Sequence, residues 1–336
     1  MSSLDAVSPR DSTSDTPPVF DLGAFERSGA VRRAELARSV DESCRTLGCF
    51  VVSGAGLPDS LVERTLRVSN EFFALPDDVK SRYGSTRNNP CFGWWQRSVD
   101  SETSVRLRET FEVGSYDNAL ALAEAGYDVE WMDRLEPIAW PTQVPHFRST
   151  WTTYLAAMED LGLRLLEVMA TALQLQPNWF GEKFDRQNSY LAGTRYPVQF
   201  DAARRSVHRM GEHVDFGTLT IIRPQAGRSG LQVRTADGVW IDALAGPDQF
   251  VVCVSEQMTR WTNDRWRAAP HRVLSPNDRE PGLSRTALAF YQHPNYDAEL
   301  AAIPTCVSPD NPARYPVGRA GDLSQSRMNA AELQGF

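Results

Sequence analysis

The chain is organised around residues 212–222, which read EHVDFGTLTII. This run is apolar and rich in β-branched residues, and its alternation predicts one continuous strand. Side chains two residues apart on a strand project from the same face, about 6.5 Å from each other along the backbone. His213 and Asp215 therefore form a candidate chelating pair, an imidazole beside a carboxylate.

A third ligand is available in residues 268–273, which read AAPHRV and contain His271, one of only five histidines in the chain. Two histidines and one carboxylate are the facial set expected for non-haem Fe(II), and they leave three coordination positions open for small molecules. The same residue types also hold catalytic Zn²⁺, so a hydrolytic zinc enzyme remains an alternative.

A strand-like run follows at residues 285–291, RTALAFY, and begins with Arg285. A guanidinium can grip a carboxylate through a two-pronged, charge-assisted hydrogen bond. Open positions on iron, together with such a cation, are what an enzyme needs in order to hold a 2-oxo acid beside the metal.

Taken together, these motifs resemble the isopenicillin N synthase-like branch of the Fe(II)/2-oxoglutarate-dependent oxygenases. The similarity is carried by HVDFG at 213–217, by WTNDR at 261–265 leading to PHRV at 270–273, and by Tyr196-Pro197. Three amino-terminal segments also resemble the family: PVFDL at 18–22, GCFVV at 48–52 and FFALP at 72–76. The similarity therefore covers most of the chain after residue 16.

The resemblance implies a mixed α/β fold with a mainly antiparallel core, a double-stranded β-helix or jelly roll flanked by helices. We expect a disordered tail over residues 1–16, an amino-terminal helical and strand region over 17–187 that packs on the core, and the β-helix with its iron site over 188–300. Residues 301–336 form a carboxy-terminal segment. The tail is rich in Ser, Asp and Thr, and it buries too little apolar surface to offset the entropy of ordering it.

By resemblance, His213, Asp215 and His271 bind Fe(II), and the co-substrate 2-oxoglutarate chelates two open positions while dioxygen takes the last. Arg285, Tyr196 and Thr194 are the candidate residues for 2-oxoglutarate. The implied reaction oxidises a C–H bond of a small molecule by hydroxylation, desaturation or cyclisation, in secondary metabolism such as antibiotic biosynthesis. Two alternatives stay open: an iron oxidase of the isopenicillin N synthase kind, which uses no 2-oxo acid and releases no succinate, and a binding protein without catalysis.

The chain departs from the family pattern at both ends of the predicted 2-oxoglutarate site. It has Thr194 where the family typically has Asn before x-Tyr-Pro, and Arg285-Thr286-Ala287 where the family has Arg-x-Ser. Ala287 shares a strand face with Arg285 but donates no hydrogen bond. Losing one hydrogen bond to a charged group weakens binding by roughly one to two orders of magnitude. A different 2-oxo acid, a shifted binding pose or a reaction without any 2-oxo acid would each fit this change.

The candidate substrate residues are mostly aromatic or basic and lie near the iron motifs in sequence or in a loop-like segment, residues 88–114, that closes over the iron in the family. They are Trp94, Trp95, Arg106, Phe111, Arg195, Phe290 and His293. The alternative for the aromatic members is packing between the two parts of the chain. Their chemistry fits a small, partly apolar substrate, with carboxylate-bearing molecules among the candidates.

The amino-acid composition limits the kinds of partner that the protein can bind. The net charge of −8 disfavours a nucleic-acid partner, because binding to phosphate depends on a basic face. The five cysteines form no paired framework, which predicts reduced thiols in a cytoplasmic protein. The sequence has no apolar run long enough for a membrane span and no apolar centre of a signal peptide in its first sixteen residues. We expect a monomer or a weak homodimer.

Overall fold

The computed structural model describes residues 16–84, 92–98, 106–116, 118–127, 137–197, 208–224, 230–274 and 284–333. The predicted disordered tail lies outside these residues, apart from Thr16. The fourteen described strands are β1 (Val19–Asp21), β2 (Cys49–Ser53), β3 (Gly93–Ser98), β4 (Arg106–Gly114), β5 (Tyr190–Tyr196), β6 (Met210–His213), β7 (Leu219–Arg223), β8 (Leu231–Arg234), β9 (Trp240–Asp242), β10 (Phe250–Val254), β11 (His271–Val273), β12 (Arg285–Gln292), β13 (Glu299–Leu300) and β14 (Gly318–Arg319).

Two sheets form the centre of the molecule. The larger sheet has the order β1-β2-β10-β7-β12-β5-β4-β3, and the smaller has the order β6-β11-β8-β9. Within them, all neighbouring strands pair antiparallel except β1 and β2. Because β1 to β4 belong to the larger sheet, the amino-terminal segments extend the same sheet that carries β5, β7, β10 and β12.

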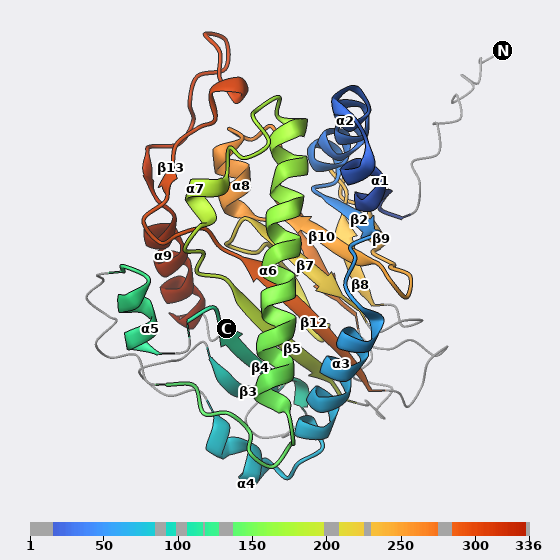
Figure 1. Cartoon of the computed structure of the whole chain (residues 1–336), viewed down its shortest axis with the longest axis vertical. Helices are drawn as coiled ribbons and strands as arrows, with labels where there is room; N and C mark the ends of the chain where they lie inside the picture. Colours follow the sequence, from blue (N-terminus) through green and yellow to red (C-terminus); the bar gives the residue numbers. More distant parts are fainter. Residues whose placement is uncertain are drawn as a thin grey trace, which may run out of the picture.

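Helices cover one face of the larger sheet (Figure 1). The described α-helices are α1 (Leu22–Arg27), α2 (Ala30–Thr46), α3 (Asp59–Phe73), α4 (Asp77–Lys80), α5 (Ala119–Glu124), α6 (Phe147–Ala172), α7 (Gly181–Phe184), α8 (Glu256–Trp261) and α9 (Ala320–Leu333). The long helix α6 crosses the sheet, with α2 and α3 beside it (Figure 1). Its apolar positions recur every three to four residues, so one stripe of the helix is buried in the core.

The apolar core has two layers, one on each face of the larger sheet. The outer layer lies under the helices and contains Trp151, Phe111 and Phe290. The inner layer lies between the two sheets, where Ile222 and Val251 of the larger sheet pack with Val233 and other residues of the smaller one. Two mainly antiparallel sheets enclosing a core of their own are the architecture expected of a jelly roll.

Two sequence expectations about local structure are wrong. Residues 212–222 do not form one strand: β6 ends at His213, β7 begins at Leu219, and the two belong to different sheets. Asp215 therefore lies in the connection between the sheets. Residues Gly93–Ser98 and Arg106–Gly114 are strands paired antiparallel, where a loop-like setting was expected for Trp94 and Trp95.

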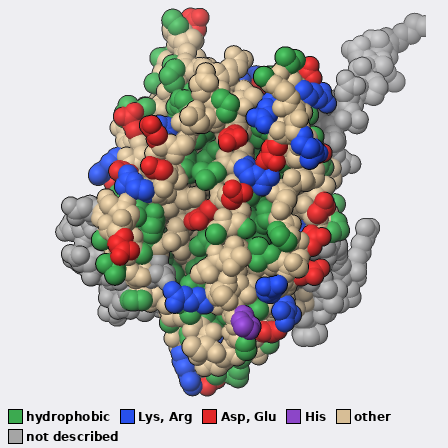
Figure 2. Space-filling model, in the orientation of Figure 1, with side chains coloured by type: hydrophobic (Ala, Val, Ile, Leu, Met, Phe, Trp, Pro, Cys, Tyr) green, Lys and Arg blue, Asp and Glu red, His purple; other side chains and the backbone are tan. Residues whose placement is uncertain are grey.

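On the face shown in Figure 2, acidic and basic side chains are interspersed, without a broad area of one sign among the described residues. None of the described helices has both the length and the apolar character required to cross a membrane.

Candidate metal centre and co-substrate cavity

The three predicted metal ligands meet in space. Their ligand atoms all lie within 4.8 Å of one another. Nε2 of His213 is 3.6 Å from Oδ1 of Asp215, and Nε2 of His271 is 3.6 Å from Oδ2 of the same carboxylate. Two donors bound about 2.1 Å from one ion at angles of about 90 to 120° are about 3.0 to 3.6 Å apart. The group therefore fits one divalent ion.

The sheet register brings the two histidines together. His213 ends β6, His271 begins β11, and the two are directly paired across these antiparallel strands. Directly opposed side chains lie on the same face with Cβ atoms about 4.5 to 5.5 Å apart. Their ring centroids are 4.2 Å apart. A shift of one residue in this register would turn one imidazole to the other face.

Hydrogen bonds fix which nitrogen of each imidazole faces the metal position. Nδ1 of His213 contacts the carbonyl oxygen of Gly211 at 2.9 Å, and Nδ1 of His271 contacts that of Ala269 at 3.0 Å. When Nδ1 donates to a carbonyl, Nε2 is left as the lone-pair donor for a metal. Both Nε2 atoms are the ones that face Asp215.

Asp215 is held by its connection to neighbouring elements. The hydroxyl of Thr220 donates to its Oδ2 at 2.6 Å. The first backbone N–H groups of α8 donate to the connection as well, from Glu256 to the carbonyl of Asp215 and from Gln257 to that of Gly217, both at 2.9 Å. Ligating carboxylates that are bonded in this way keep their orientation without the metal.

Burial and mutual charge act on the two imidazoles in different ways. Burial lowers the pKa of His213 to about 4, and the neighbouring His271 acts in the same direction. Burial, the largest single effect, also opposes the charged form of His271, but the Asp215 carboxylate, Cys253 and the hydrogen bond to Ala269 together outweigh it, so the pKa of His271 is raised. His213 is therefore neutral at pH 7, as a metal ligand must be, and metal binding displaces any proton on His271.

A cavity opens beside the triad, between the two sheets. It is lined by Thr194, Tyr196, Met210, Ile222, Pro224, Leu231, His271, Val273, Arg285, Ala287, Ala289 and Tyr291. The predicted 2-oxoglutarate residues Thr194, Tyr196 and Arg285 thus share one cavity with a metal ligand. In the β5–β12 pair, Arg285 is opposite Tyr196 and Ala287 is opposite Thr194. The guanidinium carbon of Arg285 lies 4.7 Å from the centroid of the Tyr196 ring.

Comparison with known proteins agrees with this geometry. Residues 17–143 match the model of the amino-terminal region of non-haem dioxygenases in morphine synthesis, and residues 186–294 match the 2OG-Fe(II) oxygenase superfamily. The chain is a 2-oxoglutarate- and Fe(II)-dependent oxygenase. Its catalytic class, non-haem dioxygenase, and its cofactors Fe(II) and 2-oxoglutarate follow from this membership and from the donor set of the site.

Curated relatives extend over nearly the whole oxygenase. Validamycin A dioxygenase of Streptomyces hygroscopicus subsp. limoneus is 27% identical over 95% of this chain and 88% of that enzyme. Jasmonate-induced oxygenase 2 of Arabidopsis thaliana is 29% identical over 90% of this chain and 78% of that enzyme. The match to the 2OG-Fe(II) oxygenase superfamily favours 2-oxoglutarate chemistry over the oxidase alternative.

Solved structures confirm the jelly-roll fold of the oxygenase. A 2OG-Fe(II) oxygenase family protein from Caulobacter crescentus superposes with a TM-score of 0.80 at 24% identity, over 95% of this chain and 100% of that one. JOX2, crystallised with 2OG, Fe and JA, superposes with a TM-score of 0.72 at 24% identity, over 98% of this chain and 90% of that one.

Several candidate substrate residues of the oxygenase do not face the cavity. Phe111 and Phe290 are fully buried under the helices, on the outer face of the larger sheet. Trp94 packs in the same core, and its Nε1 donates to Glu109 at 3.1 Å. Arg195 points to the helix side as well, where it donates to the carbonyl of Phe73 at 2.8 Å. These four residues support the fold, because strand alternation turns them away from the metal.

The three remaining substrate candidates, Trp95, His293 and Arg106, do not lie in this outer core. Trp95 is opposite Thr110 in the β3–β4 pair, and Thr110 in turn is opposite the cavity residue Thr194, so Trp95 shares the inner face. His293 is buried close to Asp215, its ring centroid 5.4 Å from that of Tyr190, and burial lowers its pKa to about 4. Arg106 begins β4, and its side chain lies outside the described residues.

Tyr291 is a cavity residue that the sequence analysis did not select and that strand alternation could have found. Tyr291 lies six residues after Arg285, so both project from the same face of β12, and Tyr291 lines the cavity. It stacks on Tyr190 with ring centroids 4.6 Å apart. Burial, and after it the charge of Asp215, raises its pKa well above the ordinary value.

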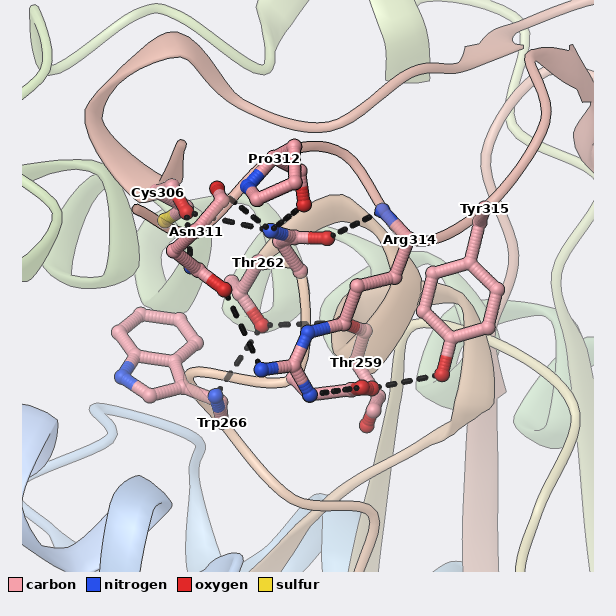
Figure 3. Close-up of polar contacts among 10 residues, drawn as sticks. Thr259, Thr262, Trp266, Cys306, Asn311, Pro312, Arg314 and Tyr315 are labelled. Carbon is pink, nitrogen blue, oxygen red and sulfur yellow. Dashed lines mark hydrogen bonds and ion pairs between the residues drawn. The ribbon is translucent and has the colours of Figure 1, made fainter. Parts of the chain in front are cut away.

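The WTNDR motif supports the site without contributing a ligand. Asn263 and Asp264 both adopt positive φ angles, 52° and 64°, in the turn that follows α8. Nδ2 of Asn263 donates to the carbonyl of Pro312, and Asp264 accepts from the side chains of Arg314 and Tyr315 (Figure 3). These contacts fasten the turn to the carboxy-terminal segment, a few residues before His271.

Proposed function

We propose that this oxygenase oxidises a C–H bond of a small molecule by hydroxylation, desaturation or cyclisation, with Arg285 and Tyr196 binding the distal carboxylate of 2-oxoglutarate. The observation that carries the proposal is one cavity that contains a metal ligand, His271, and the Arg285–Tyr196 pair. A 2-oxo acid held at that pair can reach the open side of the triad because both line the same space.

The bound iron, 2-oxoglutarate and dioxygen together supply the oxidising power, and the chain supplies positions. Arg285 provides a charge-assisted anchor for a carboxylate. Ile222, Leu231 and Val273 keep the cavity wall apolar, which excludes water and strengthens that charge interaction. Thr220 and the first turn of α8 hold the aspartate ligand in place.

The substrate class is inferred from the relatives and from the inner face of the sheet. The names of two relatives, validamycin A dioxygenase and flavanone 3-dioxygenase 2, refer to small molecules. We therefore assign this oxygenase to the modification of a secondary metabolite. Tyr291 supplies aromatic surface in the cavity, and Trp95 lies on the same inner face of the sheet, which suits a partly apolar substrate.

The test begins without oxygen. Fe(II) and then 2-oxoglutarate are added to the anaerobic protein, and the weak visible charge-transfer band of the chelate is recorded. We expect the band with the wild type, its loss with His213→Ala, and a large increase in the 2-oxoglutarate concentration required with Arg285→Ala. Arg272→Ala is the matched control, because that guanidinium bonds to Gln232 at 2.7 Å and does not line the cavity.

Turnover then separates the two chemistries. When oxygen is admitted, the proposal requires one succinate for each 2-oxoglutarate consumed, whereas an iron oxidase releases none. A band that survives Arg285→Ala unchanged would show that the assignment of Arg285 is wrong. Full iron affinity in His213→Ala would contradict the assignment of the three metal ligands.

A further inference from the structure

A second buried guanidinium lies on the inner face, outside the triad and the Arg285–Tyr196 pair. In the β4–β5 register, Glu109 is opposite Arg195 and Thr110 is opposite Thr194. Even-numbered residues of β4 therefore share the face of Thr194 and Tyr196, and Arg108 is one of them. Its side chain is 6% exposed.

Arg108 forms no ion pair with a carboxylate among the described residues. The carboxyl group of Glu112, on the same face of β4, interacts with its charge only at longer range, and burial raises the pKa of Glu112 to about 7. One terminal nitrogen donates to the carbonyl of Arg209 at 3.4 Å, a long bond, and the guanidinium carbon lies 5.3 Å from the centroid of the Trp95 ring. Its Nε is buried and has no hydrogen-bond partner in the described part of the chain. No described carboxylate forms an ion pair with it, whereas the buried Glu109, on the other face, pairs with Lys80 at 2.6 Å.

Arg108 is also close to the cavity. Strand alternation places it on the same face as Thr194 and Tyr196 of the neighbouring strand, and both of those residues line the cavity. Arg108 itself does not line the cavity, but Tyr196 and Tyr291, which interact with its charge, do. Since a buried guanidinium with an unsatisfied Nε is unfavourable, a ligand that reaches it past these two rings would complete its contacts.

We infer that Arg108 binds a carboxylate of the primary substrate, with the Trp95 ring supporting the guanidinium, so that the enzyme selects anionic molecules with an aromatic or apolar body. This inference rests on the proposed function and adds the charge of the substrate to it. A carboxylate of 2-oxoglutarate is the alternative ligand for the same guanidinium, because 2-oxoglutarate binds in the same cavity. The experiment is therefore designed to separate the two.

The probes are benzoate, phenylacetate and 3-phenylpropanoate, each compared with its primary amide. Binding to the anaerobic protein loaded with Fe(II) and 2-oxoglutarate is measured by calorimetry. We expect at least one carboxylate to bind about 10- to 100-fold more tightly than its amide, the range for one hydrogen bond to a charged group. Arg108→Gln should abolish this preference, and Arg108→Lys, which keeps the charge but not the fork of donors, should keep part of it.

Arg223→Gln is the matched control. Arg223 is also buried, 7% exposed, and donates to the carbonyls of Gly246 and Gln249, but Ile222, its neighbour on β7, is the residue that faces the cavity. This variant should keep the wild-type preference for carboxylates. Near-ultraviolet circular dichroism of each variant reports whether the core is intact, and Arg108→Lys serves if Arg108→Gln does not fold.

The concentration dependence of the 2-oxoglutarate charge-transfer band distinguishes the outcomes. If Arg108→Gln weakens the binding of 2-oxoglutarate as much as it weakens the binding of the aryl carboxylates, the guanidinium binds the co-substrate and the inference is overturned. A wild type that shows no preference for any carboxylate over its amide also overturns it. Absence of the band from the wild type would instead contradict the proposed function, so the two failures are separate.

Discussion

Replacing the hydroxyl of Thr194 by a methyl group should weaken 2-oxoglutarate binding by about 10- to 100-fold. The strand that carries Arg285 has Ala287 where a serine would be expected to donate to the distal carboxylate. Thr194 is directly opposite Ala287 in the β5–β12 pair, and both line the cavity. Opposed residues have Cβ atoms about 4.5 to 5.5 Å apart, so a hydroxyl on either strand can reach the same ligand atom.

The magnitude follows from the partner's charge. A hydrogen bond to a charged group contributes about 1.5 to 3 kcal/mol, which corresponds to the stated loss of affinity. In the structure, Oγ1 of Thr194 lies 3.2 Å from Oγ1 of Thr110. A Thr110 hydroxyl that donates to Thr194 would leave the Thr194 hydrogen for the carboxylate.

The assay compares four proteins by the anaerobic charge-transfer titration: the wild type, Thr194→Val, Ala287→Ser and the double variant. Thr194→Val should bind 2-oxoglutarate weakly, and Ala287→Ser should restore much of the affinity in the double variant because it returns one hydroxyl to the pair of strands. Thr286→Val is the control. Its hydroxyl bonds to Asn70 at 2.6 Å on the other face, so its loss should lower the free energy of unfolding by about 1 kcal/mol without changing 2-oxoglutarate affinity.

Two results would refute this reasoning. Wild-type affinity in Thr194→Val would show that the hydroxyl serves only Thr110. Weak binding in Thr194→Val that is not improved at all by Ala287→Ser would show that the two positions do not address the same carboxylate.

Three further predictions concern the surroundings of the site. Lys80→Met should lower the free energy of unfolding by about 3 to 5 kcal/mol, since it removes the closer ion-pair partner of the buried Glu109, at 2.6 Å, and leaves Arg195 at 3.9 Å. Adding Glu109→Leu should recover part of the loss in urea titrations. Gly217→Ala should weaken Fe(II) binding at least about tenfold in a metal titration, because the added Cβ would lie 2.5 Å from a backbone oxygen, whereas Gly211→Ala has open space and should fold normally. Burial raises the pKa of Glu112 to about 7 from its ordinary 4.5, so the folded state binds this proton more tightly than the unfolded state does. The free energy of unfolding should therefore fall by about 1 to 3 kcal/mol as the pH rises from 4.5 to 8. An equal fall in Glu112→Gln, which cannot titrate at this position, would disprove the assignment.

The sequence predicted the chemistry of the site better than its backbone. The motif residues His213, Asp215 and His271 were predicted from residue type and spacing, and the structure brings them together. The predicted strand spacing of His213 and Asp215 is nevertheless wrong, because Asp215 lies between β6 and β7. An apolar, β-branched run has the same composition whether it continues in one sheet or passes to another, so the break between β6 and β7 has no local signal.

Strand faces explain the errors among the substrate candidates. Phe290 was chosen because it is aromatic and close to Arg285, but an odd offset of five residues turns it to the helix side, and Tyr291 takes the cavity position. The sequence of residues 88–114 suggests a loop, and strand alternation assigns no faces in a loop. Once β3 and β4 are known to be strands, the inner face of β4 selects Arg108 and the outer face assigns Phe111 to the core.

The metal centre depends on backbone pairing in two independent places. The distance between the imidazoles is set by the β6–β11 register, and the position of the carboxylate is set by the connection to β7, where Thr220 and α8 hold Asp215. These two supports belong to different sheets, joined by only a few residues. The turn of Asn263 and Asp264 then fixes the return from α8 toward β11. A substitution in any of these supports should therefore change metal affinity without removing a ligand, which explains why so much of the recognisable motif, WTNDR included, contains no metal-binding side chain.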